Sequence, residues 1–207
     1  MRRVLVLALV MTLAGAALGI TRASFTSQTS NAANSFAAAA SFCSGGTQTA
    51  SAAADSWVDQ LLSVVNFGSD TALNVQSLAL DNRRLLVRFT LPSVPSHCSV
   101  TAAKLRLFAT SAATGRTLNA LRIAAAWSES SVTWSNQPAT TGGAATASSG
   151  TGYVEWNVMS QVQAMYSGSN NGLLVTDASE GAIAAAAQAF ASREAGSNPP
   201  QLVITFG

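Results

Sequence analysis

The basic side chains of this sequence are concentrated between positions 83 and 122, a stretch that contains no acidic residue. They are Arg83, Arg84, Arg88, Lys104, Arg106, Arg116 and Arg122. Arginine offers paired N–H donors that match a carboxylate, so a row of such groups suits a polymer that carries carboxylates at intervals. The chemistry that these residues offer is therefore anion binding, with an acidic polysaccharide as the ligand class.

The local pattern predicts strands that would carry these cations on one face. Leu85, Val87 and Phe89 alternate with Arg84 and Arg88, which places the two arginines on the opposite face of a strand. By the same alternation Lys104 and Arg106 oppose Leu105 and Leu107, and Arg122 opposes Leu121 and Ile123. If these strands are neighbours, the cations form a stripe, and the candidate ligand-binding residues are Arg84, Arg88, Lys104, Arg106 and Arg122. An ordinary solvated sheet face is the alternative.

The aromatic residues could add a stacking surface for sugar rings. Trp57 shares a predicted strand face with two acidic residues and is the candidate exposed ring, although a strand covered by a loop explains the pattern equally well. Trp134 and Trp156 alternate with apolar neighbours and are predicted to lie in the core, whereas Trp127 is undecided. Tyr153, with Glu155 and Asn157, is predicted to face the polar side.

Enzymatic patterns are largely missing from the sequence. His97 is the single histidine, and no nucleophile elbow, zinc-protease motif or phosphate-binding loop occurs. Glu129 and Glu155 could form a hydrolytic carboxylate pair only if the fold placed them at a suitable separation. We therefore predict a non-catalytic protein without a cofactor.

A structural calcium ion is left open by a group of oxygen donors close together in the sequence, although their spacing matches no known calcium loop. The donors are Asp55, Asp59, Asn66 and Asp70.

Short apolar runs separated by glycine and proline turns predict an all-β fold, namely a two-sheet antiparallel β-sandwich of jelly-roll type with one short helix. The predicted strands cover residues 57–60, 73–75, 84–89, 104–109, 119–124, 153–157, 173–176 and 201–206. Val132 and Trp134 indicate a further short strand. Asn157 is the predicted cap of the helix, which should end at Gly168. For residues 182–190 alanine content favours a helix, but we expect a strand that ends at Phe190.

The N-terminal part resembles an export signal. Two arginines precede an apolar run from Val4 to Ile20, so we expect a signal peptide over residues 1–23, a flexible linker over 24–50 and the folded domain over 51–207. An uncleaved membrane anchor is the alternative. In an exported chain Cys43 and Cys98 should form one disulfide, with two free or intermolecular thiols as the other outcome. Without the three leader arginines, eight basic residues face nine acidic ones, which gives no compositional support for binding nucleic acid or an anionic membrane.

The segment Trp127-Ser-Glu-Ser-Ser-Val-Thr-Trp134-Ser-Asn-Gln-Pro138 resembles the W-x-E-x-x-V-T-W-x-x-x-P signature of the DNRLRE domain, also described as carbohydrate-binding module family 96. Further segments resemble the family's landmarks in order, from about Thr47 to the C-terminus. They are Asp55-Ser-Trp57-Val58, Asn66-Phe67-Gly68, Arg84 to Pro92, Ala103 to Leu107, Trp156-Asn157-Val158 with Asn157 in place of the usual Asp, and Phe190-Ala-Ser-Arg193-Glu194.

The resemblance implies a secreted, non-catalytic carbohydrate-binding module, located extracellularly or at the cell surface. Residues 23–37 resemble the leader of camelysin-like precursors, which favours the alternative of a structural surface or matrix protein without a sugar ligand. Arg193 is expected to bridge to an acidic residue on a neighbouring strand rather than to bind ligand.

Overall fold

A computed structural model describes residues 42–207. The predicted signal peptide and most of the predicted linker lie outside the described residues. The strands are β1 (Gly46–Asp59), β2 (Ala72–Ser77), β3 (Arg83–Phe89), β4 (Val100–Ser111), β5 (Thr117–Ile123), β6 (Thr140–Ser148), β7 (Gly152–Asn157), β8 (Leu173–Asp177), β9 (Ala186–Ala191) and β10 (Gln201–Phe206). The helical elements are α2 (Met159–Ser167) and the 3₁₀ turns η1 (Trp134–Asn136) and η2 (Arg193–Ala195). β1 thus begins inside the segment predicted as linker.

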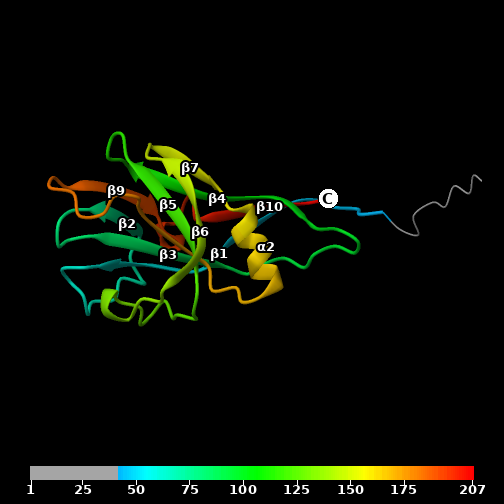
Figure 1. Cartoon of the computed structure of the whole chain (residues 1–207), viewed down its shortest axis with the longest axis horizontal. Helices are drawn as coiled ribbons and strands as arrows, with labels where there is room; N and C mark the ends of the chain where they lie inside the picture. The colour runs from blue at the N-terminus through cyan, green and yellow to red at the C-terminus, as the bar shows by residue number, and fades with distance from the viewer. Residues whose placement is uncertain (1–41) are drawn as a thin grey trace, which may run out of the picture. The chain divides into compact units, whose positions relative to one another are not determined.

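The strands pair antiparallel and close into a ring in the order β1-β10-β4-β9-β2-β3, because β1 also pairs with β3. From β3 the pairing continues outward through β8, β5 and β6, and β7 pairs with β4 (Figure 1). The predicted antiparallel β fold with one short helix is confirmed. The two-sheet sandwich is not confirmed, because a closed ring connects strands that a sandwich would divide between separate sheets.

The main core fills the ring and contains the side chains that alternation predicted to point inward. Leu85, Val87, Phe89, Leu105 and Leu107 are all buried in it. Trp156 and Phe190 are its largest fully buried members, which confirms the predicted burial of Trp156.

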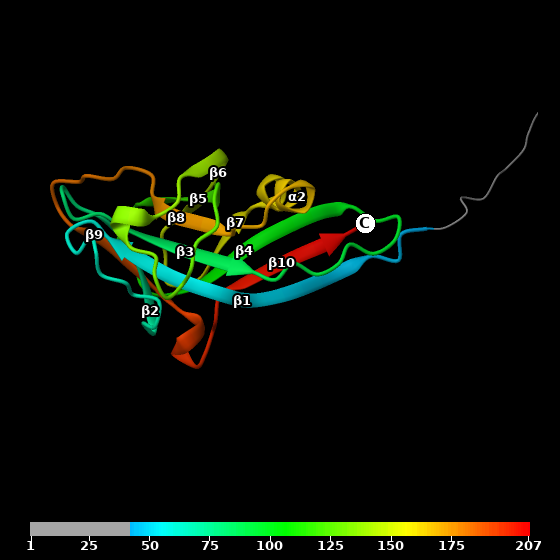
Figure 2. The same ribbon diagram turned by 90° about the horizontal axis from the view of Figure 1, so that it is seen from below.

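A second apolar cluster lies on the other face of β3, where the loop of residues 124–139 covers it (Figure 2). Its buried members are Ala54, Val58, Leu86, Ile123, Trp127, Val132 and Leu174, with Trp134 packed against them. β3 therefore contributes to apolar packing on both of its faces, so neither face is the open polar surface that alternation predicted.

Three local predictions have clear outcomes. Asn157 is not the N-cap of α2, because Val158 occupies that position, although the Asn157 side chain accepts a hydrogen bond from the Met159 amide. The helix ends at Ser167 with Gly168 as its C-cap, as predicted. Residues 186–191 form a strand, so tertiary pairing with β2 outweighs the helical preference of alanine. The strand predicted around Val132 is wrong, because Thr133 and Asn136 form a capping box that begins the 3₁₀ turn η1 instead.

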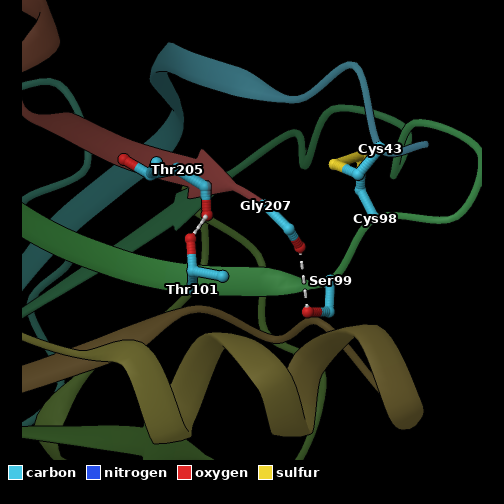
Figure 3. Close-up of a disulfide and its surroundings, with 6 residues drawn as sticks. All are labelled: Cys43, Cys98, Ser99, Thr101, Thr205 and Gly207. Atoms are coloured by element: carbon cyan, nitrogen blue, oxygen red, sulfur yellow. Dashed lines mark hydrogen bonds between the residues drawn. A yellow bond between two sulfur atoms is a disulfide. The ribbon is translucent and has the colours of Figure 1, made fainter.

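The predicted Cys43–Cys98 disulfide is confirmed, with the two Cα atoms 4.8 Å apart. It links the segment before β1 to the loop before β4 (Figure 3). Beside it the Gly207 and Ser99 backbones exchange hydrogen bonds. Figure 3 shows the Ser99 hydroxyl donating to the Gly207 carbonyl and the Thr101 hydroxyl donating to the Thr205 carbonyl. The ends of β1, β4 and β10 are thus fastened at one place. In residues 42–207 no helix has the length and apolar character needed to span a bilayer.

We expect the Cys43→Ala/Cys98→Ala variant to lose stability, because the crosslink closes a loop with a sequence separation of 55 residues. Chain entropy predicts a decrease in the free energy of unfolding of about 4 kcal/mol for such a loop. Urea unfolding of both proteins without reductant measures it, and reductant should affect only the wild type. Equal midpoints for the wild type and the variant would contradict a stabilising crosslink.

Candidate functional site

Arg84 and Arg88 lie on the face of β3 that the 124–139 loop covers. The Arg84 guanidinium forms two hydrogen bonds with the Glu180 carboxylate, at 2.6 and 2.7 Å, and lies 4.5 Å from the centre of the Trp134 ring. Arg88 lies 5.5 Å from the Trp127 ring and donates to the Trp127 carbonyl. Both arginines therefore hold the loop in place, which leaves them poorly available to a ligand.

Lys104 and Arg106 lie on β4 and do come together, as predicted. Both bind the Glu155 carboxylate across the β4–β7 pair, at 2.9 and 2.7 Å. Arg106 also donates to the Gln201 amide oxygen and lies 4.2 Å from the centre of the Tyr153 ring. These contacts place two cations, one carboxylate and one aromatic ring on neighbouring strands.

The five candidate cations do not form one stripe. β3 pairs with β1, β2 and β8, whereas β4 pairs with β10, β9 and β7, so Arg84 and Arg88 are not on a strand next to Lys104. On β5, Arg122 pairs with Leu173, which also pairs with Val87 of β3. Because paired residues share a sheet face, Arg122 lies on the face opposite to Arg88.

Of the two interpretations of Trp57, an exposed ring and a strand covered by a loop, the second is confirmed and the first is not. Its side chain is only 7% exposed, and its ring stacks on Phe67 with the centroids 3.9 Å apart. The indole N–H donates to the Asp70 carboxylate at 2.9 Å. The loop after β1 folds back over the strand and covers the ring, so alternation with acidic neighbours did not indicate solvent exposure here.

An open surface remains on the outer faces of β1, β10, β4 and β7, and we call it the polar sheet face. Cross-strand pairing aligns its members in rows, because paired residues share a face. The rows are Ser51–Gln201–Arg106–Glu155, Thr49–Val203–Lys104–Asn157 and Phe108–Tyr153. Tyr153 is 37% exposed and meets Phe108 edge to face. The predicted polar orientation of Tyr153, Glu155 and Asn157 is confirmed.

The four residues considered for calcium are engaged with protein groups. Asp59 accepts from the Leu61 and Leu62 amides and pairs with Arg83 at 2.9 Å, and Asp70 accepts from Trp57. The Asn66 amide donates to the carbonyls of Glu129 and Val132. In residues 42–207 one group of three acidic residues has carboxylate oxygens within 4.8 Å of one another. It consists of Asp55, Glu129 and Glu194, so Asp55 is the one residue of the four that belongs to it.

Arg193 contacts all three members of this acidic group and thereby connects three distant segments of the chain. Its guanidinium binds both oxygens of Glu129, at 2.8 and 2.9 Å, and also pairs with Glu194. Its backbone amide donates to the Asp55 carboxylate, and the Asp55 amide donates to Glu129. The expected bridge from Arg193 to an acidic residue is confirmed, although Glu129 lies in a loop. Sequence reasoning did not foresee that family landmarks meet here.

Three carboxyl groups face one guanidinium in this network, and Asp55 is the deeply buried member. Burial, together with the negative charges of Glu194 and Glu129, raises the pKa of Asp55 to about 7, although the Arg193 amide opposes the shift. Asp55 therefore retains its proton in mildly acidic solution.

This proton makes stability depend on pH. Between about pH 4 and pH 7 the folded protein holds a proton that the unfolded chain has released, so the stability from Asp55 is full at low pH and is lost as the pH rises. The unfolding free energy of the wild type, minus that of Asp55→Asn, should decrease as the pH rises through this window. The slope should reach up to about 1.4 kcal/mol per pH unit. Urea unfolding at four pH values measures it, and parallel curves would refute the shift.

The model of carbohydrate-binding module family 96 matches residues 46–206. The match begins at the first residue of β1 and ends at the last residue of β10, so it covers every strand described above. No curated protein matches the chain. The chain belongs to carbohydrate-binding module family 96.

Proposed function

We propose that this protein is a secreted, non-catalytic module that binds an acidic polysaccharide on its polar sheet face. Family membership supports a carbohydrate ligand. The observation that carries the choice of surface is the grouping of Lys104, Arg106 and Tyr153 on adjacent strands β4 and β7. An extended polymer can lie across such a face and meet donors and acceptors on several strands.

The aromatic ring on this face suits a sugar. A partly exposed tyrosine offers an apolar face to the C–H groups of a pyranose, and its hydroxyl remains able to form hydrogen bonds. The nearby amide side chains of Gln201 and Asn157 and the Glu155 carboxylate supply further donors and acceptors for sugar hydroxyls.

The charges on the polar sheet face support an anionic ligand. Two cations share the single Glu155 carboxylate, and the Lys104 side chain is 57% exposed. The bond from Lys104 and then that from Arg106 lower the pKa of Glu155, so it is ionised at neutral pH and one positive charge remains in excess. Exposed ion pairs contribute only about 0–1 kcal/mol, so a ligand carboxylate can compete with Glu155 at little cost.

Catalysis is not part of this proposal. Glu129, in the loop after β5, is bound by Arg193, whereas Glu155 on β7 is bound by Lys104 and Arg106 of β4. The two carboxylates considered for hydrolysis thus serve separate ion-pair networks. The signal peptide over residues 1–23, the linker over 24–50 and an extracellular location remain part of the proposal, and the disulfide supports export.

One observation favours the alternative of a surface or matrix protein. Large apolar side chains are exposed on three loops, notably Val64 at 78%, Leu80 at 80% and Ile183 at 100%. Asn82 joins these loops, since it bonds to Gln60 in the first loop and to the Gly181 amide in the third. Assembly through such a patch would appear as concentration-dependent sedimentation without sugar.

We expect Lys104→Ala/Arg106→Ala to reduce affinity for alginate and pectate by about tenfold or more, because two charge-assisted contacts are lost. Tyr153→Ala should weaken binding by about threefold to tenfold through loss of ring contact. Glu155→Gln should strengthen it, because the competing carboxylate is removed. Affinity electrophoresis in gels containing alginate, pectate or a neutral glucan measures these changes.

The control is Arg122→Ala, which removes one positive charge, as Lys104→Ala and Arg106→Ala each do, on a strand that does not belong to the polar sheet face. Its mobility in the polysaccharide gels should equal that of the wild type. Equal retardation of the wild type and the Lys104→Ala/Arg106→Ala variant in alginate would contradict the proposed surface.

A further inference from the structure

The loop between β5 and β6 contains a small hollow that is separate from the polar sheet face. Its volume is about 220 Å³, and it is open to solvent. The residues that line it are Ala126, Trp127, Ser128, Ser131, Val132 and Asn136. They all come from the segment of the family signature and its immediate neighbour, which places the hollow on the loop that covers β3.

The walls of this hollow are held by hydrogen bonds from within the protein. The Ser128 carbonyl accepts from the Ser131 and Val132 amides, and Asn66 donates to the Val132 carbonyl from another loop. Asn136 accepts from the Thr133 amide and donates to the Ser131 carbonyl. A site that is already ordered loses little conformational entropy when a ligand binds.

The floor of the hollow is fixed as well. The Trp127 indole N–H donates to the Asn171 carbonyl at 2.8 Å, and the Arg88 guanidinium lies against the ring. Val132 is buried beside Trp127 in the second apolar cluster. The Trp127 and Val132 side chains beneath the hollow are therefore fixed and almost fully buried, so the surface that the hollow offers is mainly polar and carries the hydroxyls of Ser128 and Ser131 and the amide of Asn136.

This combination selects a class of ligand. No lining residue is charged, so the hollow offers no ion pair to a carboxylate or a phosphate. Its hydroxyl and amide groups match the hydroxyls around the edge of a sugar ring. The Ser131 hydroxyl takes no part in the bonds that hold the loop, so it is free to pair with such an edge.

We propose that the hollow of residues 126–136 is a second subsite that binds one uncharged sugar ring. This rests on the proposed carbohydrate-binding function and extends it, because the two sites then differ in the charge of the unit that they accept. The polar sheet face binds the acidic units of a polymer, and the hollow binds a neutral unit or chain end.

The test uses amide chemical shifts of the ¹⁵N-labelled protein titrated with cellotetraose or mannotetraose as neutral probes and with tetramannuronate as the acidic probe. We expect the neutral probes to shift the amides of residues 126–132 and 136. Ser131→Ala should raise the dissociation constant by about threefold to tenfold through loss of one hydrogen bond. Ala126→Leu should abolish binding, because its larger side chain fills the hollow from an exposed position.

Ser135→Ala is the matched control, because Ser135 is an exposed serine of the same loop that does not line the hollow. Its binding should equal that of the wild type. Unshifted amides at 126–132 with both neutral probes, or unchanged affinity in Ala126→Leu, would overturn the subsite. Shifts of residues 126–132 that are as large with tetramannuronate as with the neutral probes would also remove it while leaving the proposed function in place.

Discussion

The Arg193–Glu129 ion pair is the interaction on which the arrangement of this protein depends. It joins η2, near the end of the chain, to the loop after β5. Glu129 also accepts a hydrogen bond from the backbone amide of Asp55 in β1. With Asn66 bonded to the same loop, the pair holds residues 124–139 over β3 and buries Trp127 and Val132. Asp55 is the buried member of this network, and its raised pKa reduces the repulsion among the three acids below about pH 7.

The segregation of charge along the sequence is cancelled in space. The basic residues lie on the strands of the first half, and the acids that follow them lie mostly on strands or loops of the second half. Arg106 meets Glu155, Arg116 meets Asp177 and Arg84 meets Glu180. This happens because late strands pair with early ones, as β7 does with β4 and β8 does with β3. Most of the basic block of the sequence thus forms ion pairs within the protein. Lys104 and Arg106 share a single acidic partner, Glu155.

Alternation predicted much of the core from the sequence, including Leu85, Leu105 and Trp156, and Gly168 correctly marked the end of the helix. The prediction of a single cationic stripe depended on which strands are neighbours, and side-chain periodicity does not contain that information. Trp57 could not be decided from alternation, because the pattern of its strand does not show that a loop covers the second face. β6 was missed because threonine, glycine and alanine give it no apolar alternation. The polar sheet face was only partly visible, since it required β7 beside β4.

The crosslink between Cys43 and Cys98 also determines how the domain would respond to mechanical load. The first residues of β1 pair with β10 alone, so tension applied ahead of Gly46 would otherwise pull on those few backbone hydrogen bonds. The covalent bond directs that tension into the segment before β4, whose strand is paired with β10, β9 and β7. Force on a tether at this end would therefore be spread over the ring rather than peel away its first strand.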